Sequence, residues 1–283
     1  MTKCHLHLRR LAVGGASVAL AATGLAVSTA PAHADSAPLN YTCERPLGSS
    51  DLKATFSAPA KVPVGGKAKV ITSVEVPADL TELLGGVGVA TIEGSAVGQA
   101  TVNEVPIEVP QSIPVTDVPT EGALTVKATG AVQLPTDFAA GTVLSVSAGD
   151  FGVTLDGKTA EGEPSLLSPY DISCVQDADQ DATVGDIKVV KAGSKTKLKV
   201  KGKKKKAVVK VKVASKTSAK ATGKVKVALK GPKKVTKKVK VNKKGVAKFT
   251  VKKLKKGKYK VNAKYLGNKN VKASKAKAKV KVK

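Results

Sequence analysis

Two cysteines are the first residues of this 283-residue chain whose type and spacing could do chemistry. Cys43 and Cys174 stand 131 positions apart. In an exported protein they would meet an oxidising compartment, where a disulfide is their natural state. Two free buried thiols are the alternative. Loop-closure entropy sets an upper figure of about 5 kcal/mol for a bridge of this span.

Histidine, the usual general base and zinc ligand, is confined to the N-terminal end. The chain has three histidines, His5, His7 and His33, and all of them precede residue 35. If that segment is removed on export, the mature chain lacks the imidazole that hydrolase triads and most catalytic zinc sites need. We therefore expect no catalysis and no cofactor.

Carboxylate pairs are the remaining catalytic candidates. Glu104 with Glu108, and Glu161 with Glu163, could flank a glycosidic bond as paired acids do in glycosidases. The surrounding segment has few aromatic residues to hold a sugar, so solvated surface acids are the better interpretation.

Three aspartates at alternate positions, Asp177, Asp179 and Asp181, are similar to the start of a calcium-binding loop. Such a loop requires a glycine next and an acid seven residues after its third aspartate, but Ala182 and Lys188 occupy those positions. We predict no metal site.

The N-terminal 34 residues are typical of a secretory signal peptide. Lys3, Arg9 and Arg10 precede an uncharged apolar run over residues 11–27, and small residues lead up to Ala34. We predict cleavage after Ala34. A membrane anchor is the alternative, but the apolar run is short for a span of about 20 residues.

Charge divides the rest of the chain into two parts. Residues 35–186 hold all 21 acidic residues and only seven basic ones, a net charge of −14, whereas residues 187–283 hold 39 lysines and no acid. So sharp a change marks a domain boundary. We predict a signal peptide over 1–34, an acidic domain over 35–174, an acidic linker over 175–187 and a lysine-rich domain over 188–283.

The acidic domain is predicted to be a β-sandwich. Short segments rich in Val, Thr and Ala are bounded by Gly, Pro, Asp or Asn, which is typical of strands. The expected strands are 52–58, 67–76, 88–92, 123–129, 142–148 and 166–174. Only residues 79–84 look helical, and prolines at 106, 110, 114 and 119 predict extended or edge segments.

The lysine-rich domain alternates lysine with apolar residues, which predicts a second sandwich with valines inside and lysines outside. The expected strands are 209–213, 224–230, 235–241, 246–251, 258–265 and 276–282. Lys237 interrupts the alternation and predicts a bulge or an edge strand. A disordered tail is the alternative, and residues 203–206 and 275–283 are expected to be the least ordered.

Two resemblances support this division. Segments 221–227, 242–249, 254–259 and 263–270 resemble a bacterial immunoglobulin-like repeat of secreted and surface proteins, which implies an Ig-like sandwich. Residues 39–43 (Leu-Asn-Tyr-Thr-Cys) with Pro46, Leu47, the Gly65–Gly66 turn and Cys174 are similar to a domain of unknown function common in secreted actinobacterial proteins. That second resemblance implies secretion and a β-rich fold but no activity.

The lysines then point to function. Like charges packed this densely destabilise a compact state unless a partner neutralises them. Lysine is a flexible point charge suited to diffuse contacts with anions. We expect a secreted protein, associated with the cell wall, that binds an anionic wall polymer or glycan. The predicted binding residues are Lys224, Lys226, Lys234, Lys238, Lys240, Lys258, Lys260 and Lys264.

Two other partners stay open. Non-specific nucleic-acid binding fits the charge, but export and the lack of arginine for base edges count against it. The acidic domain of one molecule could also bind the basic domain of another, giving self-association.

Overall fold

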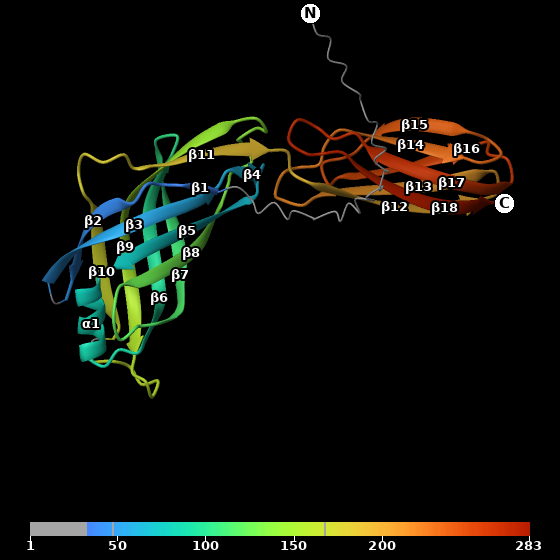
Figure 1. The fold of residues 1–283 in the computed structure, drawn as a ribbon. Coiled ribbons are helices and arrows are strands. Elements are labelled where there is room, and N and C mark those ends of the chain that lie inside the picture. The colour runs from blue at the N-terminus through green and yellow to red at the C-terminus, as the bar shows by residue number, and fades with distance from the viewer. Residues whose placement is uncertain (1–32, 47, 167) are drawn as a thin grey trace, which may run out of the picture. The chain divides into compact units, whose positions relative to one another are not determined.

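The structure is a computed structural model that describes residues 33–46, 48–166 and 168–283. These residues form an all-β protein of two domains with one short helix, as the sequence predicts (Figure 1). Most of the predicted signal peptide lies outside the described residues. Its last two residues, His33 and Ala34, lie in strand β1, which pairs with β3.

The first domain contains one helix and eleven strands among the described residues. The helix is α1 (Ala78–Gly86), and the strands are β1 (His33–Asp35), β2 (Leu39–Arg45), β3 (Gly48–Pro59), β4 (Lys61–Pro63), β5 (Lys67–Val76), β6 (Thr91–Val102), β7 (Val105–Asp117), β8 (Leu124–Gln133), β9 (Val143–Lys158), β10 (Tyr170–Gln176) and β11 (Thr183–Val190).

Eight of these strands close into a cylinder. Each pairs antiparallel with the next in the order β10-β2-β3-β5-β8-β7-β6-β9, and β9 pairs back with β10. The predicted sandwich therefore has its two layers joined at their edges. One seam is thin, because β7 pairs with β8 only at Gln111 and Ser112. Pro106 and Pro110 share one parity in β7, so the N–H groups that they lack would face the same neighbouring strand, and Pro114 lies where the register of β7 with β6 shifts.

Strand β9 holds three neighbours together. The first half of β9 pairs with β11 and its second half pairs with β10. Along its other edge, β9 pairs with β6. The register of β6 with β9 shifts between Gly98 and Ala100, which is a β-bulge. The bulge bends β9 at Gly149 and Asp150, where its partner changes.

The predicted acidic linker over 175–187 differs from the structure. It holds the last residues of β10 and the first part of β11, which pairs with β9 and β4. The physical reason is an apolar set in and just after this acidic segment: Val184, Ile187 and Val189 are buried in the core. Their side chains hold β11 in the first domain despite the surrounding aspartates.

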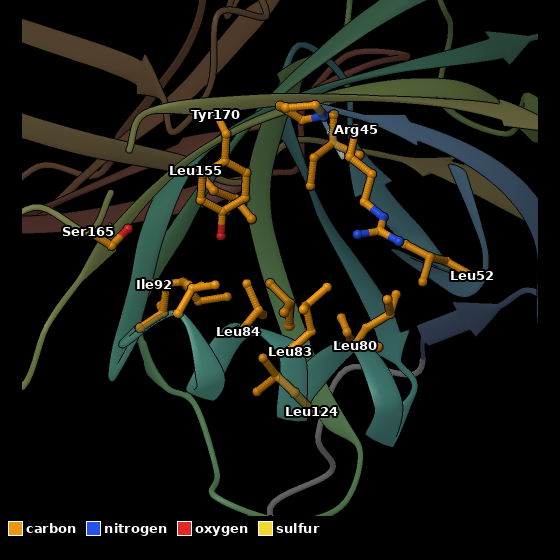
Figure 2. Close-up of a pocket in the computed structure, with 16 residues that line it drawn as sticks. Arg45, Leu52, Leu80, Leu83, Leu84, Ile92, Leu124, Leu155, Ser165 and Tyr170 are labelled. Carbon is orange, nitrogen blue, oxygen red and sulfur yellow. The ribbon is translucent and has the colours of Figure 1, made fainter. Parts of the chain in front are cut away.

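Helix α1 covers one end of the cylinder (Figure 1). It contains the predicted helical segment and directs Leu80, Leu83 and Leu84 toward the interior (Figure 2). The helix starts after Pro77 without a side-chain cap and ends in Gly85 and Gly86. Within residues 33–46, 48–166 and 168–283, no helix has the length and apolar character that crossing a membrane requires.

The second domain is a sandwich of two antiparallel sheets. Its strands are β12 (Ser194–Lys203), β13 (Lys206–Ser215), β14 (Lys224–Lys230), β15 (Val235–Lys240), β16 (Val246–Lys252), β17 (Gly257–Tyr265) and β18 (Ser274–Val282). One sheet has the order β12-β13-β16 and the other β15-β14-β17-β18. The inward valines of β13 and β14, including Val209, Val211, Val225 and Val227, are completely buried.

Two buried tyrosines connect loops of this sandwich to its core through hydrogen bonds. The Tyr259 hydroxyl donates to the Lys255 carbonyl at 2.9 Å, four residues upstream, as in the tyrosine corner of Ig-like folds. The Tyr265 hydroxyl donates to the Thr222 carbonyl at 2.6 Å. Both rings are buried, so each hydroxyl has a partner where water cannot reach it.

Candidate functional site

The eight lysines predicted to bind anions all lie on one sheet or its margin. Seven of them are in β14, β15 and β17, and Lys234 immediately precedes β15. All eight side chains are exposed. Because alternate residues of a strand point to opposite faces, the buried valines between them fix these lysines on the outside of the sandwich.

Register places the lysines in rows that cross the sheet. One row runs through all four strands, β15, β14, β17 and β18, and consists of Lys238, Lys226, Lys264 and Lys275. A second row, Lys230, Lys260 and Lys279, crosses β14, β17 and β18. Two further pairs are Lys224 with Lys240 and Lys258 with Lys281. Directly opposed residues of an antiparallel pair lie on the same face, so each row is a line of neighbouring ammonium groups.

The lysines of β18 were not among the predicted binding residues. Lys275, Lys277, Lys279 and Lys281 belong to the segment that was expected to be least ordered, yet β18 pairs with β17 over nine residues. The signal in the sequence was the same lysine–apolar alternation, with alanine at two of the inward positions and valine at two others. We call the lysines on the outer face of this sheet the lysine face: Lys224, Lys226, Lys230, Lys238, Lys240, Lys258, Lys260, Lys264, Lys275, Lys277, Lys279 and Lys281.

The opposite sheet carries a smaller set. Lys199, Lys210 and Lys248 form a row across β12, β13 and β16, and Lys203, Lys206 and Lys252 form another. Val208 and Thr250 interrupt the lysines between these two rows. The lysine face has the row that spans more strands and the larger number of outward lysines of the two surfaces.

Repulsion between like charges destabilises the lysine face when no anionic partner is bound. Adjacent strands are about 4.8 Å apart, and alternate residues of one strand about 6.8 Å apart. Both spacings are shorter than the Debye length of about 8 Å at physiological ionic strength, so neighbouring ammonium groups repel one another. Residues 187–283 contain no acid that could offset the repulsion.

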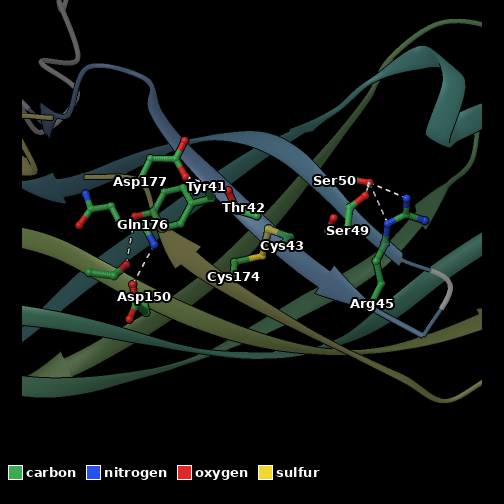
Figure 3. Close-up of a disulfide and its surroundings, with 11 residues drawn as sticks. Tyr41, Thr42, Cys43, Arg45, Ser49, Ser50, Asp150, Cys174, Gln176 and Asp177 are labelled. Carbon is green, nitrogen blue, oxygen red and sulfur yellow. Dashed lines mark hydrogen bonds between the residues drawn. A yellow bond between two sulfur atoms is a disulfide. The ribbon is translucent and has the colours of Figure 1, made fainter. Parts of the chain in front are cut away.

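The disulfide predicted from the sequence is present. Cys43 of β2 and Cys174 of β10 are register partners and form a bond between two strands of the cylinder (Figure 3). Both cysteines are buried. The pair is structural, since it joins the second strand of the domain to one of its last.

Residues close to the disulfide make hydrogen bonds to the bulge of β9. Tyr41 donates its hydroxyl to the carbonyl of Gly149 at 3.0 Å, on the β9 bulge. The bulge residue Asp150 accepts a hydrogen bond from the backbone of Gln176 (Figure 3). Burial, together with the charge of Asp150, raises the pKa of Tyr41. Strand β2 thus fixes the bend of β9 through one buried hydroxyl.

The carboxylates considered for catalysis do not gather around a cleft. Glu104 lies in the turn between β6 and β7, and Glu108, Glu161 and Glu163 are exposed, as is Glu104. Of the calcium candidates, Asp177 accepts a hydrogen bond from Thr42, and Asp181 accepts one from the backbone of Thr183. Thr183 lowers the pKa of Asp181 through hydrogen bonds from its side chain and its backbone. In the described part of the chain, no group of three or more His, Cys, Asp or Glu residues is arranged to hold a metal ion.

Fold and surface together define a two-domain all-β protein whose second domain is an Ig-like sandwich with a polycationic outside. The chain belongs to the family of unknown function DUF6801, which matches residues 40–185. Residues 188–283 match the bacterial Ig-like domain of group 3. Both predicted resemblances are confirmed, in the predicted order.

Comparisons with other proteins add little beyond this. Among solved structures, a candidate membrane-anchored protein from Corynebacterium diphtheriae is similar at 13% identity and a TM-score of 0.29, over 89% of this chain and 59% of that one. Fibronectin(III)-like modules of CbhA from Clostridium thermocellum match at 10% identity and a TM-score of 0.26, over 79% of this chain and 88% of theirs. This chain thus spans about three fifths of the first protein's length. TM-scores this low support no argument, and a search of curated proteins found no match.

Proposed function

We propose that this protein is a secreted, non-catalytic protein of the cell surface or wall, and that its Ig-like domain attaches electrostatically to anionic polymers. The observation that carries the proposal is the row Lys238, Lys226, Lys264 and Lys275, which spans a whole sheet in a domain without acidic residues. The two matched families supply no catalytic activity that would compete with a binding role.

A long polymer fits this surface better than a small anion. The charges are spread over the strands of an exposed face rather than gathered in a cleft. A single exposed ion pair contributes about 0–1 kcal/mol, so a small anion with one or two contacts would bind weakly. A polymer that engages many lysines at once gains avidity through its effective concentration. Anionic wall polymers and glycans have this repeating form.

Attachment to the wall is testable by fractionation. If electrostatic contacts retain the protein, it should sediment with the wall and be released by high salt, because salt screens exposed charges. Release by detergent alone, or accumulation in the cytoplasm, would count against the proposal.

Binding itself is testable with a defined polyanion and matched variants. The triple variant Lys226→Gln, Lys264→Gln, Lys275→Gln interrupts the four-strand row. The control Lys243→Gln, Lys255→Gln, Lys269→Gln removes the same charge from exposed residues outside the strands. With long-chain polyphosphate, we expect the row variant to bind about tenfold more weakly than the control at low salt. The slope of log affinity against log salt should fall by roughly three in the row variant.

The same titration separates the other candidate partners. Equal losses in the two triple variants would mean that net charge, and not the row, governs binding. Tighter binding to duplex DNA than to polyphosphate at equal charge would favour the nucleic-acid hypothesis. A particle that shrinks with salt when no polymer is present would favour self-association through the acidic domain.

A further inference from the structure

The interior of the first domain is not completely filled. Beneath α1, the cylinder contains a partly open cavity of about 120 Å³. Leu52, Ile92, Leu124 and Leu155 line it from the strands, and α1 contributes its leucines (Figure 2). Closed cylinders of eight strands are either filled by their own side chains or hold one small ligand. An aliphatic cavity of this order is large enough for a guest the size of benzene.

The cavity continues toward the middle of the domain. A second hollow of about 60 Å³ lies deeper in the cylinder. Five residues line both spaces: Leu52, Val76, Val126, Leu155 and Ile172. The free space is therefore elongated, which suits a chain of methylene groups better than a compact ring.

Two hydroxyl groups in the lining have no partner. Among the residues that the structure describes, the Ser165 Oγ and the Tyr170 Oη are buried without a hydrogen bond. Ser165 as a whole is only 6% exposed. Figure 2 shows the Tyr170 hydroxyl pointing into the space above the α1 leucines. Burial raises the pKa of Tyr170, so this hydroxyl remains a donor at neutral pH. A buried hydroxyl without a partner is unfavourable, and an oxygen atom of a ligand would supply the missing bond.

The surroundings of the cavity favour a neutral ligand head. Among the described residues that line it, Arg45 is the charged one, and its guanidinium donates to Ser50 through Nε and Nη2. A shallow hollow outside the cavity shares Arg45 and Tyr170 with it and adds Glu44 and Asp171, so charges of both signs meet there. This hollow has two carboxylates and one guanidinium, so no excess of positive charge there would favour an anionic head.

Helix α1 provides a way in. It is nine residues long, Thr81 is its buried residue, and its last two residues are glycines. A short helix with no side-chain cap and with terminal glycines belongs to the least stable part of a domain and can open locally. Leu83 is 46% exposed although it also lines the cavity, so the cover is thin at that point.

We propose that the first domain binds a single aliphatic chain with a neutral, oxygen-bearing end, such as a medium-length alcohol or an acyl ester. Its methylene groups lie among the leucines and valines, and its oxygen bonds with the Tyr170 or Ser165 hydroxyl. This site is independent of the lysine face, and either one can exist without the other.

Octan-1-ol is a suitable probe, because it is uncharged and the lysines do not attract it. Calorimetric titration of the full chain should show saturable binding at one site per molecule. Val126→Phe places a ring in both hollows and should abolish binding. Tyr170→Phe should weaken binding about tenfold, the loss of one hydrogen bond, while the unliganded domain becomes more stable because the unpaired hydroxyl is gone.

Three controls make the result decisive. Lys226→Gln should leave octan-1-ol binding unchanged, which separates this site from the lysine face. Circular dichroism should show that Val126→Phe keeps the strand content of the parent. Octanoate should bind no better than octan-1-ol at about 1 M NaCl, where screening leaves a Debye length of roughly 3 Å. Absence of saturable binding, or equal affinity in the parent and in both cavity variants, would overturn the proposal.

Discussion

At the scale of single residues, Tyr41 shows how one side chain can hold a bend in a neighbouring strand. Its ring packs against Phe151 with a centroid separation of 4.8 Å, and its hydroxyl donates a hydrogen bond to the carbonyl of Gly149 at the β9 bulge. The bulge interrupts the ladder there, and the tyrosine hydroxyl satisfies the exposed carbonyl. Tyr41 therefore stabilises the bulge, and the bulge supplies the hydrogen-bond acceptor for the buried tyrosine hydroxyl.

This arrangement predicts an alkaline loss of stability. The pKa of Tyr41 is raised in the folded protein, mainly by burial, whereas an unfolded tyrosine ionises near pH 10. Above pH ~10 the unfolded state releases a proton that the folded state keeps, so the free energy of unfolding falls by up to about 1.4 kcal/mol per pH unit. Tyr41→Phe removes that contribution, and its deficit in stability relative to the parent should shrink between about pH 8 and pH 11. Urea unfolding of the first domain at both pH values measures it.

Thr42→Val is the matched control for this experiment. It removes a hydrogen bond from the adjacent residue of β2, to Asp177, without removing an alkaline titration. Its effect on stability should be the same at both pH values. A constant deficit in Tyr41→Phe as well would contradict the assignment.

At the scale of elements, β15 shows how an exposed edge is protected. Among the strands that the structure describes, it pairs with β14 alone and forms one edge of its sheet, which is one of the two possibilities, a bulge or an edge, that Lys237 predicted. Lys237 lies opposite the buried Val227 and is therefore on the inner face, yet its side chain is exposed. An inward-facing charge on an edge strand discourages pairing with a second molecule.

Substituting this lysine should promote association. Lys237→Val completes the apolar inner face of β15 and removes the charge, so we expect dimers or larger species at concentrations where the parent is monodisperse. Lys238→Val makes the same chemical change on the outer face and should have a much smaller effect. Sedimentation velocity over a concentration series measures the difference, and equal association of both variants would contradict the role of Lys237.

At the scale of the whole molecule, charge is separated between two domains. Residues 35–186 carry a net charge of −14, and residues 187–283 carry 39 positive charges without a negative one. Self-repulsion of that magnitude lowers the stability of a compact state, so the Ig-like domain must rely on its buried valines and tyrosines. A polyanion would relieve the repulsion and bind at the same time.

Salt should therefore stabilise the second domain. Screening weakens the repulsion between lysine rows, and each kcal/mol recovered raises the melting temperature of a domain of this size by about 4–8 °C. We expect its thermal transition to rise with NaCl, and to rise at low salt after lysine acetylation. Calorimetry of the full chain follows both domains at once, and the transition of the first domain should shift much less. A transition of the second domain that is indifferent to salt would show that the repulsion is already offset.

Much of this architecture follows from the sequence, because its signals are local or compositional. Alternation of lysine with apolar residues over β14 and β17 defines two faces wherever the strands come to lie, since successive side chains point in opposite directions. The loss of acidic residues after Asp186 separates the domains. Cys43 and Cys174 were the natural pair for a disulfide in an exported chain, and the structure contains it.

Only the tertiary structure determined the features that depend on which strands pair with each other. Pairing of β9 with β10 closes the cylinder, and no property of either strand alone specifies it. Val184, Ile187 and Val189 keep β11 in the first domain, although its acidic neighbours predicted a linker. Register between strands distant in the sequence turned scattered lysines into rows, and closure of the cylinder brought α1 over a cavity with two unpaired hydroxyls. The physical reason is the same in each case: alternation sets the direction of a side chain, while its neighbours are set by contacts between remote parts of the chain.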